Sequence, residues 1–470
     1  MEEGKCFIGL EIGSSKIAAV VGLQQQKKIK VIGFSERQIS PTDEVLRFGN
    51  VENAQITSEF IGEVLDDLAG DFERSDYEFQ LNTVNINITN LSLNTHSKNT
   101  RVVTSGGMNR ILQDDVNRLT DDANRSFKAP AGHTVLHSLP KDFYVGDEKA
   151  SGTIVGKIGN MLSGDFNFIT TKSDNLHYLL ECVNQVPAKG TTSGFLNVEN
   201  VILNTIADSC ALLNNSSEEP ETKRDGVAIV NIGAEMTQIS VYHGNSLRYQ
   251  SAIPIAGNSI NHDLEKAFGI TFQEAELLKK VCGSIPPSVT EESPVIVIER
   301  KFGMPAKEVY LKNAVTVAEW RLREIATLVS AELQRSGYKG HLLNGIVLTG
   351  GTSLYVNIAG IFAQVCKNVI VRPTLFNTAI DFNGFDTLRN PKYSTLLGLI
   401  TAPAFPFDRR VDNRILTPRP IVNMHPRPEK EAAPSAEPDK ATGSIFSFMG
   451  GIFRKPTNDL NDEYNVQNVK

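Results

Sequence analysis

The chain has 470 residues, of which 40% are hydrophobic and 21% are charged, with a formal net charge of −7. This length exceeds what one hydrophobic core supports and predicts at least two large domains, while the negative charge argues against binding along nucleic acid. The five cysteines show no CxxC spacing and no apolar run is long enough to cross a bilayer, so we expect a reducing cytoplasm and at most peripheral membrane contact.

Strand-like patterns open the chain, at residues 7–12, 16–23 and 30–34. An amphipathic helix is predicted next, because apolar residues recur with the i, i+3, i+4, i+7 spacing of one helix face. These residues are Ile61, Val64, Leu65 and Leu68. The same spacing predicts further helices around residues 176–183 and 358–365.

A weak internal repeat is the most informative feature of the organisation. Residues 7–13 (FIGLEIG) resemble residues 227–233 (VAIVNIG), and each copy continues into a second strand-like run, at 16–21 or at 237–242. Both copies therefore predict β-hairpins with polar, glycine-bearing tips. Two related lobes that meet at a cleft are implied.

The tip of the first hairpin combines residue types that suit a polyphosphate. Gly13 permits close approach of the backbone, Ser14 and Ser15 offer hydroxyl donors, and Lys16 offers a positive charge. The alternative is an ordinary hairpin turn. The second copy, with Gly233 and its neighbours at matched spacing, favours the phosphate site.

A third element, residues 345–352, is a buried strand that ends in Gly350 and Gly351 and leads to the predicted helix at 358–365. The glycines would let a flat ring or a phosphate reach the main chain, and the helix N-terminus would supply free N–H groups. The alternative is a tight turn between strand and helix that binds nothing.

The amino-acid composition changes after residue 402. Residues 403–442 are rich in proline and charge and predict a linker, with a root-mean-square reach of about 35 Å if flexible. Residues 443–455 then predict an amphipathic helix, with its basic residues at the C-terminal end. The apolar face would carry Ile445, Phe446, Phe448, Met449, Ile452 and Phe453, and the basic Arg454 and Lys455 outside that face would also contact the membrane.

This helix could pack on the body or on a partner, but the preceding linker and the phenylalanines favour a membrane interface. Its two glycines weaken the helix by about 1 kcal/mol each, so one copy should bind lipid reversibly. Residues 456–470 form a polar tail with no predicted role.

Taken in order, the two hairpin tips and residues 345–352 resemble the phosphate-1, phosphate-2 and adenosine motifs of the actin, sugar-kinase and Hsp70 superfamily. Within it the chain is most similar to the bacterial FtsA family. Residues 9–16 (GLEIGSSK) resemble the opening of FtsA, and residues 347–351 (VLTGG) resemble its adenosine motif. The resemblance covers about residues 5–402 and the C-terminal apolar segment.

The resemblance implies an α/β, actin-like two-lobed fold: a duplicated RNase H-like core with the small FtsA insertion called 1C. The expected domains are 1A at 1–82 and 173–200, 1C at 83–172, 2A at 201–263 and 339–402, and 2B at 264–338. The disordered linker, amphipathic helix and polar tail follow.

It also implies that ATP and Mg²⁺ bind in the cleft. Glu11 would be the catalytic acid and would hold Mg²⁺ through a bound water. Arg321 would lie in the groove of 2B that docks the C-terminal tail of FtsZ; the alternative is a solvated arginine on a helix surface. The expected nucleotide-binding residues are Gly13, Ser14, Ser15, Lys16, Gly233, Ala234, Gly257, Asn258, Glu276, Lys279, Gly350, Gly351 and Thr352.

The second hairpin departs from the family pattern. Asn231 and Gln238 stand where the family has acids, and an amide can neither carry negative charge nor accept a proton at neutral pH. Glu235 replaces a glycine that would let the backbone approach a phosphate. We therefore expect ATP to bind as a conformational and polymerisation cofactor, with slow hydrolysis or none.

The function implied is an adaptor that anchors FtsZ filaments to the inner face of the cytoplasmic membrane at the division site. It would self-assemble into filaments and contact membrane lipids and other division proteins. The alternatives are a sugar-kinase-like phosphotransferase and an actin-fold ATPase like PilM.

Overall fold

The computed structural model describes residues 5–73, 80–189, 194–213, 221–285, 294–300, 305–367 and 369–404. All of them belong to one compact unit, Met1–Pro420; a second unit, Ile421–Lys470, lies outside the described residues. The amphipathic helix predicted at 443–455 and the tail at 456–470 also lie outside them. The predicted linker is described only at 403–404, where Pro403 still belongs to a helix.

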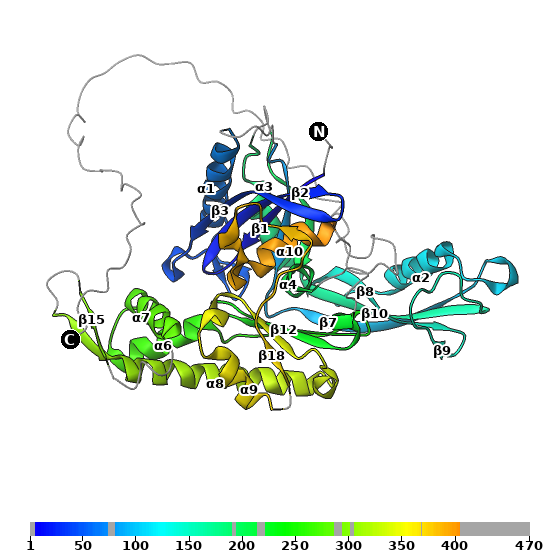
Figure 1. The fold of residues 1–470 in the computed structure, drawn as a ribbon. Helices are drawn as coiled ribbons and strands as arrows, with labels where there is room; N and C mark the ends of the chain where they lie inside the picture. The colour runs from blue at the N-terminus through cyan, green and yellow to red at the C-terminus, as the bar shows by residue number, and fades with distance from the viewer. Residues whose placement is uncertain are drawn as a thin grey trace, which may run out of the picture. The chain divides into compact units, whose positions relative to one another are not determined.

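The first lobe is built on a six-stranded sheet, which begins with the opening strands of the chain (Figure 1). Its order is β11 (Asn197–Leu203), β6 (Thr83–Ile88), β1 (Cys6–Ile12), β2 (Lys16–Gln25), β3 (Lys28–Gln38) and β19 (Ile380–Asp381). Strands β1, β2 and β3 run antiparallel, whereas β6 lies parallel to both β1 and β11. Strand β2 is buried over Lys16–Gly22 and apolar from Ile17 onward in that range, as expected of a strand covered on both faces.

The second lobe repeats this plan. Its sheet has the order β18 (Val371–Arg372), β17 (Ile346–Thr349), β12 (Val227–Ile232), β13 (Thr237–His243) and β14 (Ser246–Ile253). Strands β12, β13 and β14 run antiparallel, and β17 lies parallel to both β12 and β18. The order and directions match those of β11, β6, β1, β2 and β3, which confirms the predicted duplication and the actin-like fold class.

The two hairpins share their register as well as their strands. Ile12 pairs with Ile17 at the end of the first, and Ile232 pairs with Thr237 at the end of the second. In each tip the glycine N–H closes the turn, from Gly13 to the Lys16 carbonyl at 3.0 Å and from Gly233 to the Met236 carbonyl at 3.1 Å. The weak sequence repeat therefore corresponds to two equivalent turns.

Helices α4 (Asn204–Leu212) and α10 (Ser394–Ala404) contact each other along their length and share a core cluster with both sheets. Their crossing is close because Gly398 has no side chain: a Cβ there would lie 2.1 Å from the Ala207 carbonyl oxygen. These two helices hold the lobes together.

Further helices cover the outer faces of the lobes. The predicted apolar face of α1 (Ala54–Glu73) is buried, as is that of α3 (Ser173–Asn184), both in the core of the first lobe. In the second lobe, α6 (Gly257–Phe268), α7 (Phe272–Ser284), α8 (Leu311–Arg335) and α9 (Ile358–Val365) share one core. A ribbon of β15 (Val295–Ile298) and β16 (Lys307–Tyr310) borders them.

An inserted sheet with its own core follows β6. Its order is β7 (Asn94–Val103), β10 (Met161–Lys172), β8 (His133–Val145) and β9 (Glu148–Lys149), and α2 (Gln113–Ser126) packs on it. Asp142 on β8 pairs with Arg248 on β14 of the second lobe, at 2.6 and 2.9 Å. The inserted sheet is thereby tied to the second lobe.

The remaining short elements are β4 (Leu46–Arg47), β5 (Asn50–Val51), α5 (Glu221–Arg224) and the 3₁₀ turns η1 (Pro41–Asp43), η2 (Gly107–Asn109), η4 (Lys339–His341), η5 (Gly351–Leu354), η6 (Asp386–Arg389) and η7 (Pro391–Tyr393). Among the described helices, none combines the length and apolarity that a bilayer span requires.

Candidate functional site: a cleft between two hairpins

The two hairpin tips are joined by a side chain from the second. The carboxylate of Glu235 accepts a hydrogen bond from Ser14 Oγ at 2.7 Å and another from the Phe48 N–H at 2.6 Å. Ser14 lies in the tip of the first hairpin, and Phe48 lies in the turn between β4 and β5. Glu235 is therefore directed toward the first lobe.

Behind the first tip lies an ion pair between Lys16 and Glu11, whose side chains are both largely buried. Lys16 Nζ also lies 5.4 Å from the centre of the Tyr393 ring, within range of a cation–π contact. The positive charge of Lys16, which the sequence predicts to bind a phosphate, is thus already paired with Glu11.

A second buried acid, Asp208 on α4, lies beneath the second hairpin. Its carboxylate accepts hydrogen bonds from Asn231 Nδ2 at 2.8 Å, Ser394 Oγ at 2.8 Å and Thr395 Oγ1 at 2.9 Å. Burial raises the pKa of Asp208 to about 6, the three hydrogen bonds oppose this rise, and the charge of Glu11 adds to it. A carboxyl group is therefore present beside the position where Asn231 replaces the family acid.

The tip of the second hairpin is held by its neighbours in the second lobe. The Gly233 carbonyl accepts hydrogen bonds from the Gly257 N–H at 3.1 Å and from Thr352 Oγ1 at 2.9 Å. The Ala234 carbonyl accepts one from the Asn258 N–H at 2.7 Å. Three sequence segments that lie far apart therefore meet at this tip.

Glu276 and Lys279 on α7 border the same region. Lys279 Nζ lies 2.5 Å from Glu276 Oε2 and 3.4 Å from the Gly257 carbonyl, while Asn261 donates to the same carboxylate oxygen at 2.7 Å. Burial alone would raise the pKa of Glu276, but Lys279 and Asn261 hold it below its usual range. Burial lowers the pKa of Lys279 against the pull of Glu276.

The two glycines after β17, Gly350 and Gly351, also border the cleft. Gly350 has φ +87°, and a Cβ there would lie 2.3 Å from Asn231 Oδ1, whereas a Cβ at Gly351 would meet no atom within 4 Å. Gly350 thus packs against the second hairpin while Gly351 borders open space. Helix α9 begins at Ile358, as predicted, but the chain after the glycines first enters the 3₁₀ turn η5. The physical reason is a Thr352 hydroxyl bonded back to Gly233, which holds the turn against the hairpin.

The structure thus gathers the predicted residues of the two tips, of α6, of α7 and of residues 350–352 around one region. Arg321 lies apart, on α8, where it pairs with Asp263 of α6 at 2.6 and 2.8 Å and with Glu324. The hydrogen bonds to Asp263 raise the pKa of Arg321. The predicted membrane residues at 445–455 lie outside the described residues.

Two groups at this site, the Asp208 carboxyl and the Phe48 N–H, were not predicted from the sequence. Asp208 could have been suspected, because it is the only charged residue in the mostly apolar stretch 203–213. The backbone N–H of Phe48 has no sequence signal, since it acts through a turn that only the folded chain places near Glu235.

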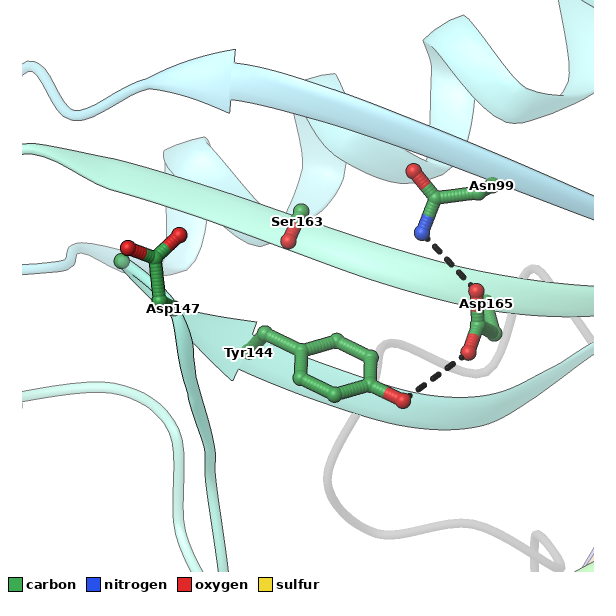
Figure 2. A pocket seen from close by; sticks show the side chains of 6 residues that line it. Asn99, Tyr144, Asp147, Ser163 and Asp165 are labelled. Atoms are coloured by element: carbon green, nitrogen blue, oxygen red, sulfur yellow. Dashed lines mark hydrogen bonds between the residues drawn. The ribbon is translucent and has the colours of Figure 1, made fainter.

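Two cavities stand out among the described residues. One, of about 250 Å³, lies beside the hairpin contact and is lined by Ser14, Phe48 and Glu235 together with residues of β4 and α6 and residues that flank η1. The other, of about 280 Å³, lies on the inserted sheet, where Asp165 accepts hydrogen bonds from Asn99 at 2.8 Å and Tyr144 at 3.1 Å (Figure 2). It is an open polar hollow away from both hairpins. Within the described ranges, no three His, Cys, Asp or Glu side chains form a metal cluster.

Two sheets that share one order of five strands, with matched hairpins facing one cleft, define a protein of the actin-like class. A solved structure of this kind is "PilM-PilN type IV pilus biogenesis complex", with a TM-score of 0.57 and 15% identity, over 85% of this chain and 99% of that one. At this identity the likeness shows the fold alone.

The chain belongs to the FtsA family. The model "Cell division protein FtsA" matches residues 228–398, and "SHS2 domain inserted in FTSA" matches residues 93–170, which together span more than half of the chain. Curated FtsA proteins are similar along most of their length. That of Pseudomonas aeruginosa is 27% identical, covering 85% of this chain and 89% of its own; that of Borreliella burgdorferi is 28% identical, covering 84% and 90%.

Proposed function

We propose that this chain is an actin-like cell-division adaptor that binds a nucleotide between its lobes and links FtsZ filaments to the cytoplasmic membrane. The observation that carries the proposal is the pair of matched hairpins facing one cleft, in a chain that belongs to the FtsA family. The family's own description is a cell-division protein.

The residues around the cleft fit ATP. The space beside Gly351 would admit a flat ring, with Glu276 and Lys279 bordering it, and the tips at Gly13–Lys16 and Gly233–Ala234 would hold the phosphates. Thr352, Gly257 and Asn258 would position the second tip through their bonds to its carbonyls. Bound ATP would supply a flexible contact between the lobes.

Mg²⁺ would arrive with the nucleotide, since it is commonly held by phosphates and only one or two carboxylates. Glu11 is the candidate acid for a water bound to that ion. Because Glu11 already pairs with Lys16, Glu11 would interact with both Lys16 and the Mg²⁺ water, and Lys16 with both Glu11 and a phosphate. With Asn231 in place of an acid, we propose slow hydrolysis or none.

The remaining parts of the proposal concern partners. The domain at 264–338 would dock the C-terminal tail of FtsZ, with Arg321 at the groove. The ion pair between Arg321 and Asp263 would have to break before Arg321 could contact an acidic group of the tail. Residues 443–455 would lie on the inner face of the membrane at the division site. Filaments of this chain would multiply weak single-helix binding through effective concentration, and other division proteins would assemble on them.

Deletion of residues 443–455 tests the adaptor against the sugar-kinase alternative. The adaptor predicts that the shortened protein leaves the membrane and that cells fail to divide, whereas a kinase would keep its distribution and leave division unchanged. Fluorescence microscopy with immunoblotting for equal protein level reads both outcomes. The match of two FtsA models favours the adaptor over the kinase and over a PilM-like ATPase.

Phosphate release from purified protein tests the catalytic part. We expect a rate far below that of ordinary actin-like ATPases and little change in Glu11→Ala. A rapid rate that Glu11→Ala abolishes would refute the proposal of a non-hydrolysing scaffold.

A further inference from the structure

Glu235 makes the cleft of this chain unusual. Its carboxylate accepts hydrogen bonds from the hydroxyl of Ser14 and the N–H of Phe48. An anion bound between the hairpins would otherwise accept hydrogen bonds from these two donors. Hydrogen bonds from neutral donors to a charged acceptor are among the stronger ones. Glu235 is therefore a resident anion at the junction of the lobes.

The Phe48 donor is held in place by its turn. Phe48 has φ +47° and Gly49 has φ +75°. A Cβ at Gly49 would lie 1.8 Å from the Thr89 carbonyl oxygen and 3.1 Å from Met236 Cε, so the turn between β4 and β5 packs tightly between the residue that follows β6 and the second hairpin. The Phe48 N–H is thus built into the fold as a fixed donor.

The order of the groups around the cleft indicates which phosphate Glu235 would replace. The elements proposed for the base, Glu276, Lys279 and Gly351, belong to the second lobe, and that lobe's own hairpin is the nearer one. The first hairpin lies on the other sheet, so a chain of phosphates that starts at the base reaches Ser14 last. The donor that Glu235 occupies is therefore the one expected to contact the terminal phosphate.

We propose that Glu235 substitutes for the terminal phosphate of a nucleoside triphosphate, closing the cleft by itself and making it selective for a nucleoside diphosphate. This inference rests on the nucleotide site proposed above. A diphosphate would leave the Glu235 contacts intact, whereas a triphosphate would have to displace the carboxylate and sit beside its charge. The cavity lined by Glu235, Ser14 and Phe48 gives the displaced side chain space to occupy.

Titration of the full chain with fluorescent ADP and ATP analogues in Mg²⁺ tests the selectivity. We expect the wild type to bind the ADP analogue about tenfold or more tightly than the ATP analogue, which corresponds to ~1.4 kcal/mol or more. Glu235→Gly should tighten ATP binding about tenfold and change ADP binding little. Glu235→Gln, which keeps an acceptor without the charge, should fall between the two.

Glu44→Gln is the matched control, because Glu44 lines the same cavity and is exposed; its ratio of ADP to ATP affinity should equal that of the wild type. Hydrogen exchange of the peptide that contains Phe48 gives a second readout without nucleotide. The Phe48 amide should exchange slowly in the wild type and at least about tenfold faster in Glu235→Gly.

Equal ADP and ATP affinities in the wild type, or a ratio unchanged in Glu235→Gly, would overturn the selectivity. Rapid exchange at Phe48 in the wild type would overturn the contact itself. If no variant binds either nucleotide, the proposed nucleotide site is wrong and the selectivity falls with it, while the exchange data still decide whether Glu235 joins the hairpins.

Discussion

Asp208 and Asn231 form a buried carboxylate–amide pair, with Asn231 Nδ2 donating to Asp208 at 2.8 Å. The pair gives a physical reason for the missing acid of the second hairpin. A second carboxylate at residue 231 would face Asp208 at hydrogen-bond distance in a site shielded from water, and like charges there repel strongly.

Asn231→Asp should consequently destabilise the protein by about 3 kcal/mol, the cost typical of an uncompensated buried charge. The exchanged pair, Asn231→Asp with Asp208→Asn, should recover most of the loss, because one amide and one carboxylate again face each other. Urea unfolding of both variants at pH 7 measures this. Equal stability of the single and double variants would show that the pair does not decide residue 231.

The raised pKa of Asp208 predicts a pH dependence of its own. The folded state holds the proton up to about pH 6, whereas an unfolded aspartate releases it near pH 4. The stabilisation from this proton is complete below pH 4 and is lost as the pH rises through 6, an amount of about 2–3 kcal/mol.

Asp208→Asn removes this titration, so the stability of the wild type relative to the variant should fall by that amount between pH 4 and pH 7. Thermal and urea unfolding at several pH values provide the comparison. The difference isolates Asp208 from His137, whose burial lowers its pKa to about 4 and which acts with the opposite sign in the same range. A pH-independent difference would contradict the assignment.

The pair between Asp142 and Arg248 predicts a strong link between the inserted sheet and the second lobe. Arg248 is 3% exposed and Asp142 is 11% exposed. Burial alone would raise the pKa of Asp142, yet the hydrogen bonds from Arg248 and Lys149 lower it. Arg248→Ala should cost about 3 kcal/mol, because it leaves a buried carboxylate without its main partner.

Lys149→Ala is the control on the same carboxylate. Lys149 is 60% exposed and lies 2.8 Å from Asp142, so its loss should cost less than about 1 kcal/mol. Denaturant unfolding compares the two variants, and equal effects would argue against a buried link. Hydrogen exchange along β8 should rise in Arg248→Ala alone.

The crossing of α4 and α10 predicts intolerance of any side chain at Gly398. Gly398→Ala would push a methyl group to 2.1 Å from the Ala207 carbonyl oxygen, so the helices must separate at a cost of about 3 kcal/mol. Gly62→Ala on α1 is the matched control, since a Cβ there meets nothing within 4 Å. That change should stabilise the helix by up to about 1 kcal/mol. Thermal unfolding compares the stabilities of both variants with that of the wild type. A Gly398→Ala variant as stable as the wild type would refute the close crossing.

The sequence alone determined the features that repeat over a few residues. The hairpins at 7–23 and 227–242 follow from strand-like runs around glycine tips, and the buried faces of α1, α3 and α9 follow from helical spacing. These patterns are local, because each strand or helix must bury its own apolar residues. The order of the motifs then sufficed to indicate the family.

The contacts between residues of the cleft depend on tertiary packing and could not be derived from sequence patterns. Ser14 and Glu235 are 221 residues apart, and the chain between them includes the whole inserted sheet. Asp208 meets Ser394 and Thr395 across 186 and 187 residues. No local periodicity encodes such contacts, since they depend on how two sheets and the helices between them pack. Read in sequence, Glu235 is one of three departures from a motif, but in the folded chain its carboxylate connects the two lobes.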